Sequence, residues 1–221
     1  MGRILTEDLF DLTRSIAAPF FAADEEPYRV LSGLADKIIE LGKTLDAELF
    51  DSPQENVWIA KSAKVAPSAC IMPPCIIDEG AEIRHCAFIR GSALVGEDCV
   101  VGNSVELKNV ILFDNVQVPH FNYVGDSILG YKSHMGAGSI TSNVKSDKTL
   151  VVVKNGAEQI PTGLKKFGAM LGDRVEVGCN SVLNPGTVIG KDTNIYPTSC
   201  VRGVVPENSI WKTGGVVVKK I

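Results

Sequence analysis

The sequence predicts a mainly β protein, built as a parallel β-helix of hexapeptide repeats with a short helical segment before it. Aliphatic residues recur every six positions over long stretches, a period that fits neither a helical face nor an ordinary strand but is typical of a hexapeptide β-helix. Aromatic residues make up 6% of the 221-residue chain, whereas glycine occurs 21 times, which favours short strands and tight turns. With 45% apolar residues, the chain can bury a substantial core.

Residues 1–55 lack the six-residue period, and we expect them to form a helical appendage. Thr6 can cap a first helix, and Pro27 can occupy the first turn of a second one. Apolar residues at three- and four-residue spacing follow, and Gly42 is expected to cap the end of the second helix. The segment has no glycine-rich phosphate loop, so it predicts packing against the main body or a neighbouring subunit rather than nucleotidyl transfer.

The six-residue period defines a second expected unit, residues 56–221. Its first run of aliphatic positions is Ile59, Val65, Ile71, Ile77, Ile83, Ile89, Val95, Val101 and Leu107, and its second run is Leu171, Val177, Leu183, Ile189, Ile195 and Val201. Between the runs the period loosens, and residues 142–168 form a polar insertion with a predicted hairpin turn at Asn155 and Gly156. Such insertions often carry binding sites. The flat walls of stacked strands predict a homo-oligomer.

Charge and cysteine usage narrow the functional classes. The net charge is −4 and the basic residues are scattered, so we expect no nucleic-acid partner. No apolar run approaches the roughly 18 residues of a membrane span, so we expect no membrane insertion. The six cysteines contain no CxxC pair, which predicts buried thiols in a reducing cytosol and no metal or disulfide. We therefore expect a cytoplasmic protein.

Among the three histidines, His120 is the candidate general base. His85 lies inside a strictly periodic repeat, where a structural role is expected. His120 instead follows Pro119 where the period loosens, with Tyr123 three residues later. An amine that attacks a thioester must lose a proton, and histidine suits that task because its side chain titrates near neutral pH. From the residues alone, a structural role for His120 stays open.

Four motifs stand in a specific order along the chain: IRG at 89–91, VGNSVELK at 101–108, HFNYVGD at 120–126 and MGAGSITSN at 135–143. Together they resemble the C-terminal acetyltransferase domain of the bifunctional bacterial enzyme that makes UDP-N-acetylglucosamine. The whole chain, appendage included, is similar to stand-alone bacterial proteins related to UDP-N-acetylglucosamine pyrophosphorylase, which carry the β-helix without the nucleotidyltransferase half.

The resemblance implies a left-handed parallel β-helix with about three hexapeptides per coil, assembled as a homotrimer with acetyl-CoA bound between neighbouring coils. It also implies residue roles: His120 as general base, Arg90 and Lys108 on the sugar phosphate, Tyr123 and Asn143 on the sugar, and the backbone of Ala137 at the acetyl-CoA thioester. A guanidinium and an ammonium suit a phosphate, and a phenol and an amide suit sugar hydroxyls.

Some positions depart from the family pattern. His134 stands where the family has an asparagine, so it joins the candidate substrate-binding residues. Lys145 and Lys148 both approximate the family's phosphate-contacting lysine, and Lys148 is retained as a candidate. Cys179 replaces a serine near the cofactor. The insertion has no counterpart in the family, so the substrate can be a different amino sugar phosphate.

Three functional hypotheses follow. The first is an acetyl-CoA-dependent N-acetyltransferase acting on an amino sugar 1-phosphate such as glucosamine 1-phosphate, in nucleotide sugar synthesis. The second is a non-catalytic or regulatory trimer that binds a sugar nucleotide or partner protein. The third is a metal lyase of the γ-carbonic anhydrase type, which needs three histidines at a subunit interface, whereas those of this chain lack the expected close spacing.

Overall fold

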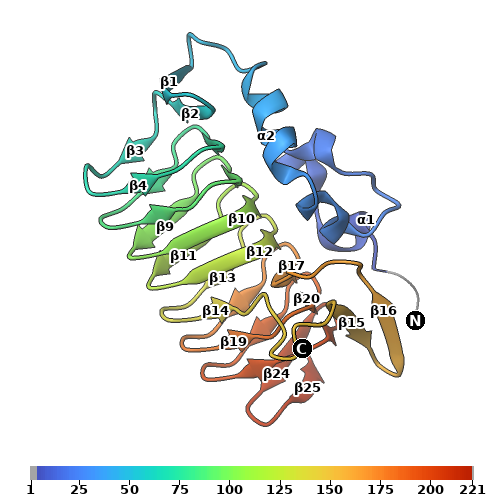
Figure 1. Cartoon of the computed structure of the whole chain (residues 1–221). Helices are drawn as coiled ribbons and strands as arrows, with labels where there is room; N and C mark the ends of the chain where they lie inside the picture. The colour runs from blue at the N-terminus through green and yellow to red at the C-terminus, as the bar shows by residue number, and fades with distance from the viewer. Residues whose placement is uncertain (1–3, 221) are drawn as a thin grey trace.

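The computed structural model describes residues 4–220 and consists of a β-helix with a helical segment along one side (Figure 1). The predicted mainly β solenoid is confirmed, and its left-handed sense stays a prediction. The helical segment contains α1 (Thr6–Leu9), α2 (Leu34–Gly42) and the 3₁₀ helices η1 (Leu12–Arg14), η2 (Ala18–Phe20) and η3 (Pro27–Leu31). Within residues 4–220, no helix has both the length and the apolar character needed to cross a membrane.

Three stacks of short parallel strands form the walls of the coil. The first wall contains β3 (Lys64–Val65), β6 (Glu82–Ile83), β9 (Val100–Asn103), β11 (Gln117–His120), β13 (His134–Met135), β18 (Glu176–Val177), β21 (Asn194–Ile195) and β24 (Ser209–Lys212), with β25 (Val216–Lys219) antiparallel at its end. The second wall contains β4 (Cys70–Ile71), β7 (Phe88–Ile89), β14 (Ile140–Thr141), β19 (Val182–Leu183) and β22 (Cys200–Val201).

The third wall contains β2 (Val57–Ala60), β5 (Cys75–Ile77), β8 (Ala93–Val95), β17 (Ala169–Leu171), β20 (Thr187–Ile189) and β23 (Val204–Val205), with β1 (Phe50–Gln54) antiparallel to β2. Two longer strands, β10 (Glu106–Leu112) and β12 (Tyr123–Leu129), bend from the second wall into the third and join both. The hairpin of β15 (Val152–Asn155) and β16 (Glu158–Pro161) lies in the insertion. Its two loop residues are Gly156 and Ala157, one position later than predicted.

The pairing register explains why the sequence period loosens. In the early coils, Val57 pairs with Cys75 and Cys75 with Ala93, so one coil takes 18 residues, or three hexapeptides. Val110, however, pairs with Ala93 17 residues before it and with Ser127 17 residues after it. Each of these two shorter coils therefore turns one of its corners with one residue fewer.

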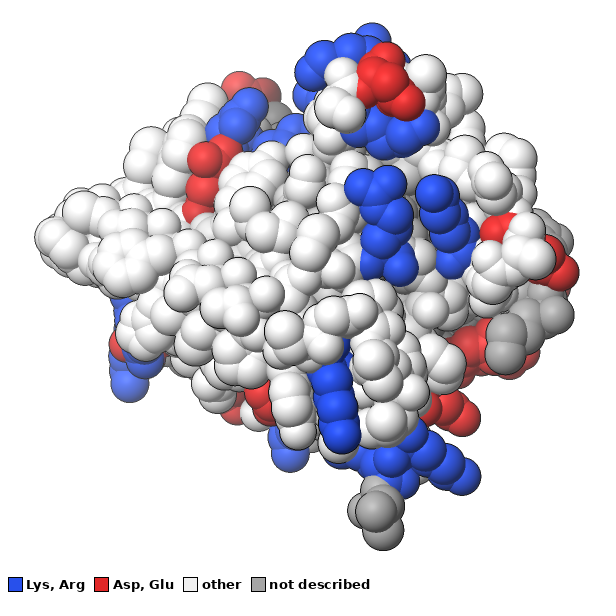
Figure 2. Space-filling model, turned by 90° about the horizontal axis from the view of Figure 1, so that it is seen from below, with Lys and Arg blue, Asp and Glu red and all other residues white. Residues whose placement is uncertain are grey.

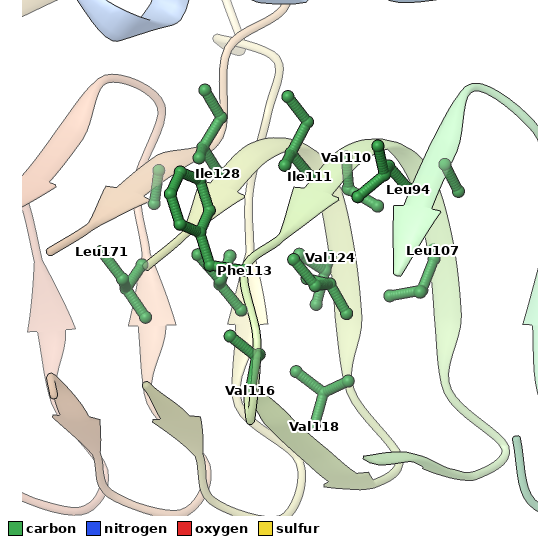
Figure 3. Packing of buried hydrophobic residues seen from close by; sticks show 14 of the residues in the cluster. Leu94, Leu107, Val110, Ile111, Phe113, Val116, Val118, Val124, Ile128 and Leu171 are labelled. Carbon is green, nitrogen blue, oxygen red and sulfur yellow. The ribbon is translucent and has the colours of Figure 1, made fainter. Parts of the chain in front are cut away.

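The aliphatic positions of the repeat fill the interior of the coil. Figure 3 shows Leu107, Val118 and Val124 pointing inward from successive strands, and all three are fully buried. Burial of this kind contributes about 1.5–3 kcal/mol per large aliphatic side chain. Val65, in the first coil, is still 36% exposed because a terminal coil has a neighbour on one side only.

The third wall is apolar on its outer side as well, because the helical segment covers it (Figure 1). Ile111 and Ile128 point away from the interior in Figure 3, and both are fully buried. Phe10, from the helical segment, stacks on Phe113 of the coil with ring centroids 5.0 Å apart. The segment thus completes the core of the solenoid.

Three expectations for the helical segment were wrong in detail. Thr6 does not cap α1 but is its first residue. Its hydroxyl and its N–H both donate to the carbonyl of Glu25 and not to the helix. The predicted second helix is split into η3 and α2 by Gly33, whose φ is +79°. Gly42 is the last residue of α2 rather than a left-handed cap, and a Cβ there would lie 2.3 Å from the ring of Trp58. Close packing explains this glycine.

Candidate active site

His120 lies at a corner of the coil between the first and second walls, which we call the histidine corner. Successive coils place His85, Asn103, His120, Ala137 and Cys179 at the same position of this corner. From Asn103 onward, the amide of the residue after each one donates to the carbonyl of the corner residue one coil before, as Gly138 does to His120 at 3.0 Å and Asn180 does to Ala137 at 2.9 Å. The structure thus brings His120, Ala137 and Cys179 into one column.

The backbone of His120 is fixed by a buried asparagine. Asn122 is 2% exposed, and its side-chain oxygen accepts a hydrogen bond from the His120 N–H at 3.1 Å. Its amide group donates to the carbonyls of Gly136 at 2.8 Å and Ser139 at 3.0 Å. Asn122 therefore joins the turn of His120 to the Gly-Ala-Gly turn of the next coil. The side chain of His120 is exposed at this corner.

A second buried polar side chain, Asp126, organises the second wall beside the corner. Its carboxylate is 3% exposed and accepts hydrogen bonds from Lys108 at 2.9 Å, Asn109 at 2.9 Å and Asn143 at 2.5 Å. The amide of Asn143 also donates to the Tyr123 hydroxyl at 3.1 Å. Three residues proposed from the sequence, Lys108, Tyr123 and Asn143, thus form one network around a carboxylate that was not singled out.

The electrostatics of this network favour a neutral phenol and paired cations. Partial burial, followed by the nearby Asp126 carboxylate, raises the pKa of Tyr123 above its ordinary value. Arg90, one coil before Lys108, donates to Glu106 at 2.7 Å, and this hydrogen bond raises the pKa of the guanidinium further. Both cations of the candidate site therefore have a carboxylate partner.

The tight corners of the two short coils create this network. At Asn109 and Asp126 the chain turns the corner between the second and third walls with a single residue. The φ angles there are positive, +55° and +47°, and Asn and Asp tolerate such angles better than most residues. Their side chains then meet one above the other. The sequence did carry a signal, because Leu107 to Leu112 and Val124 to Leu129 are spaced by five rather than six.

The insertion begins and ends at the same corner. The carbonyl of Asn143 accepts from the amide of Phe167 at 3.0 Å, and the carbonyl of Asp126 accepts from that of Gly168 at 2.8 Å. Gly168 permits this approach, since a Cβ there would lie 2.3 Å from the carbonyl oxygen of Gly125. The chain thus leaves the coil beside the network and returns to it there.

The remaining candidates lie apart from this group. His134 is on the first wall, where its Nδ1 is 2.8 Å from the carboxylate of Glu176. Lys148 is exposed in a turn of the insertion. His85 contacts the hydroxyl of Ser68 at 2.6 Å. Within residues 4–220, no group of three or more His, Cys, Asp or Glu side chains is arranged to hold a metal ion.

Comparison with known proteins gives matches to parts of this chain. A family model described as the GMPPB C-terminal domain matches residues 71–160. The protein named Bifunctional protein GlmU of Methanococcus maripaludis is 34% identical over 119 residues, covering 53% of this chain and 29% of the relative. The bifunctional sugar-1-phosphate nucleotidylyltransferase/acetyltransferase of Sulfurisphaera tokodaii is 34% identical over 109 residues, covering 49% of this chain and 27% of the relative.

The chain therefore spans less than a third of the length of these relatives. Among solved structures, a hexapeptide transferase family protein from Anaplasma phagocytophilum matches 75% of this chain and 79% of its own, with 14% identity and a TM-score of 0.42. The resemblance predicted from the four motifs is confirmed, because one relative is named Bifunctional protein GlmU and the other has acetyltransferase in its name.

Proposed function

We propose that this hexapeptide-repeat chain, a relative of bifunctional sugar-1-phosphate nucleotidylyltransferase/acetyltransferases, is an acetyl-CoA-dependent N-acetyltransferase that acts on an amino sugar 1-phosphate. The supporting observation is the network of Lys108, Tyr123 and Asn143 around Asp126, which begins within three residues of His120. Phenol, amide and ammonium groups are those expected around a phosphorylated sugar. The proposed working form is a cytoplasmic homotrimer.

In the proposed reaction, the amine nitrogen of the sugar bonds to the carbonyl carbon of the acetyl thioester. His120 accepts the proton that the nitrogen loses, and the sulfur of CoA leaves with the electron pair of the broken C–S bond. Beyond His120 the histidine corner carries Ala137 and Cys179, whose small side chains favour the approach of a thioester along the corner. His120 donates and accepts through its backbone, which leaves its exposed ring for the substrate.

The two cations contribute differently in this proposal. Arg90 and its partner Glu106 are 48% and 33% exposed, and an exposed ion pair of this kind is weak, so a phosphate can displace Glu106 at little cost. The ammonium of Lys108 is instead held by the buried Asp126 at 2.9 Å. We therefore propose that Arg90 is the principal phosphate ligand and that Lys108 assists it.

One observation favours the alternative of a non-catalytic or regulatory trimer that binds a sugar nucleotide. Arg90 and Lys108 are both neutralised by carboxylates within the chain, which lowers their attraction for a sugar phosphate. The chain would then retain the fold and the binding wall of an acyltransferase while using them to bind a ligand or another protein.

An assay of CoA release from acetyl-CoA and glucosamine 1-phosphate separates the two proposals. We expect His120→Ala to lower kcat by about 10²–10⁴-fold, the usual contribution of a general base. His85→Ala is the matched control, because His85 occupies the same corner position two coils earlier and should leave the rate unchanged. If neither glucosamine 1-phosphate nor a panel of other amino sugar phosphates is turned over, the enzymatic proposal fails.

Two substitutions test the candidates that lie outside the network. Should the His134 ring reach the substrate, His134→Asn will change KM for the sugar phosphate. Lys148→Ala will do the same if the exposed Lys148 closes over the phosphate. From their positions in the chain we expect the effect of each variant on KM to be smaller than that of Arg90→Ala.

A further inference from the structure

A polar groove lies between the insertion and the last coils of the β-helix. Its volume is about 470 Å³, within the range of small-molecule sites. Its lining includes Lys145, Asp147, Lys154, Asn184 and Arg202. It begins at Ser142, directly beside Asn143 of the candidate active site, but none of the network residues described above lines it. Most of its lining side chains are hydrogen-bonding or charged.

The hairpin that forms one side of the groove is held firmly against the coil. Val151 and Val153 are buried, and the backbone of β15 passes over two glycines of the coil. A Cβ at Gly186 would lie 2.8 Å from the carbonyl oxygen of Val152, and one at Gly203 would lie 2.6 Å from that of Lys154. A larger residue at either glycine would push the hairpin away. The groove is therefore a built feature rather than the gap beside a loose loop.

Two cations in this groove have no carboxylate partner. Lys145 lies 3.3 Å from Asp147, so that pair is neutral. For Lys154 and Arg202, in contrast, no carboxylate among residues 4–220 lies within 4 Å, and Arg202 donates only to the neutral side chain of Asn184 at 3.2 Å. Positive charge without a carboxylate partner thus lies in the groove, unlike that of Arg90 and Lys108. On the face seen from below, Figure 2 shows Lys and Arg side chains lying next to each other among uncharged residues.

The register sets how far this charge lies from the network. Ser142, Asn184 and Arg202 occupy equivalent positions on three adjacent strands of the second wall, one residue beyond the paired residues of β14, β19 and β22. At about 4.8 Å per strand, Ser142 and Arg202 are roughly 10 Å apart. The Cβ of Lys154 lies 3.3 Å from where a Cβ of Gly203 would be, so the Lys154 side chain begins beside the residue that follows Arg202. A ligand that reaches both the network and these cations must be elongated.

We infer that the groove binds the phosphate or diphosphate group of a nucleotide-containing ligand, with Lys154 and Arg202 as its cationic contacts. Guanidinium and ammonium groups bind phosphate oxygens through charge-assisted hydrogen bonds, and Ser146, Gln159 and Asn184 add neutral donors. The phosphate can belong to a nucleotide sugar or to CoA. This inference does not rest on acyl transfer, because a chain that only binds its ligand would use the same contacts.

Titration calorimetry of the full chain with UDP, with CoA and with inorganic pyrophosphate tests the inference. Lys154→Ala and Arg202→Ala should each weaken binding about tenfold, and the double variant about a hundredfold, as expected for charge-assisted contacts near the surface. Lys212→Ala, which removes an exposed cation of β24 outside the groove, is the control and should leave binding unchanged. Lys154→Arg should keep the affinity within about threefold, because it preserves the charge.

The ligand that loses affinity identifies the source of the phosphate. Weaker binding of UDP in the double variant points to a nucleotide sugar, and weaker binding of CoA points to the acyl donor; either outcome supports the groove. The inference is overturned if the double variant binds UDP and CoA as tightly as the wild type, or if the wild type binds none of the three probes. Both side chains are exposed, so the variants should fold, which circular dichroism can verify.

Discussion

Replacing Asp126 with asparagine tests whether one buried carboxylate holds the candidate site together. Asparagine keeps the shape of the side chain and tolerates the positive φ of +47° at this corner. It removes the negative charge that faces Lys108 and exchanges one of two acceptor atoms for a donor. The amides of Asn109 and Asn143, which both donate to Asp126, can then no longer both find an acceptor there.

The magnitude follows from these contacts. A buried donor that loses its acceptor costs about 1–3 kcal/mol. The side chain of Lys108 is 25% exposed and can turn toward water, so its loss adds about 1 kcal/mol or less. We therefore expect Asp126→Asn to lower the free energy of unfolding by about 2 kcal/mol. The matched control is Glu106→Gln, which breaks the exposed pair with Arg90 one coil away and should cost under about 1 kcal/mol.

Urea unfolding followed by circular dichroism at one fixed protein concentration measures both variants, and the fixed concentration matters if the chain associates. A double-mutant cycle with Lys108→Met gives the coupling between Lys108 and Asp126. If Asp126→Asn unfolds at the same urea concentration as the wild type, or if Glu106→Gln costs as much, the distinction between a buried organising carboxylate and a surface pair is refuted.

Three further substitutions have expected outcomes. Burial raises the pKa of Asp114 to about 6, above its unfolded value near 4, so the stability of the wild type falls as pH rises between these two values. In urea unfolding, Asp114→Asn should therefore be more stable than the wild type at pH 7, by about 1 kcal/mol after allowance for solvent screening. Below pH 4 the two proteins should be equally stable. Asn122→Ala should cost about 2–3 kcal/mol and speed hydrogen exchange in the turn that follows Gly136; unchanged exchange would contradict the proposed link between the turns. Gly168→Ala should lower the melting temperature more than Gly156→Ala, because a Cβ at Gly168 would lie 2.3 Å from a backbone oxygen. At Gly156 a Cβ meets nothing within 4 Å, and the cost there is only the strain of its positive φ of +61°, about 1–2 kcal/mol. Similar melting temperatures would contradict the close approach of the insertion.

The β-helix could be predicted from the sequence because the aliphatic residues of its core recur every six positions. Inward positions such as Ile89 and Leu107 belong to a regular six-residue spacing, and this spacing is not found in helices or in ordinary strands. The helical segment was harder to predict. The roles of Thr6 and Gly42 depend on tertiary partners, Glu25 and the Trp58 ring, which a local capping rule does not contain.

The sequence predicted several side chains of the candidate site but not the buried carboxylate that they surround. Lys108, Tyr123 and Asn143 come from motifs that resemblance identifies, and the structure brings them together. Asp126 and Asn122 were missed because their importance comes from burial beneath the site rather than from a reactive group at its surface. The five-residue spacing at the two tight corners was visible in the sequence. The sequence alone, however, did not tell which corner of the coil was shortened, and so did not indicate that Asn109 and Asp126 meet there.

The insertion leaves and rejoins the coil at touching points, Asn143 and Phe167, and this separates its length from the architecture of the solenoid. A segment whose two ends are already adjacent can be lengthened at small entropic cost, about 0.6 kcal/mol for each doubling of the loop. The register of the coils on either side therefore does not depend on the length of the segment between Asn143 and Phe167. A change in the length of the hairpin, at the border of the polar network, should therefore leave the wall that carries Asp126 as it is.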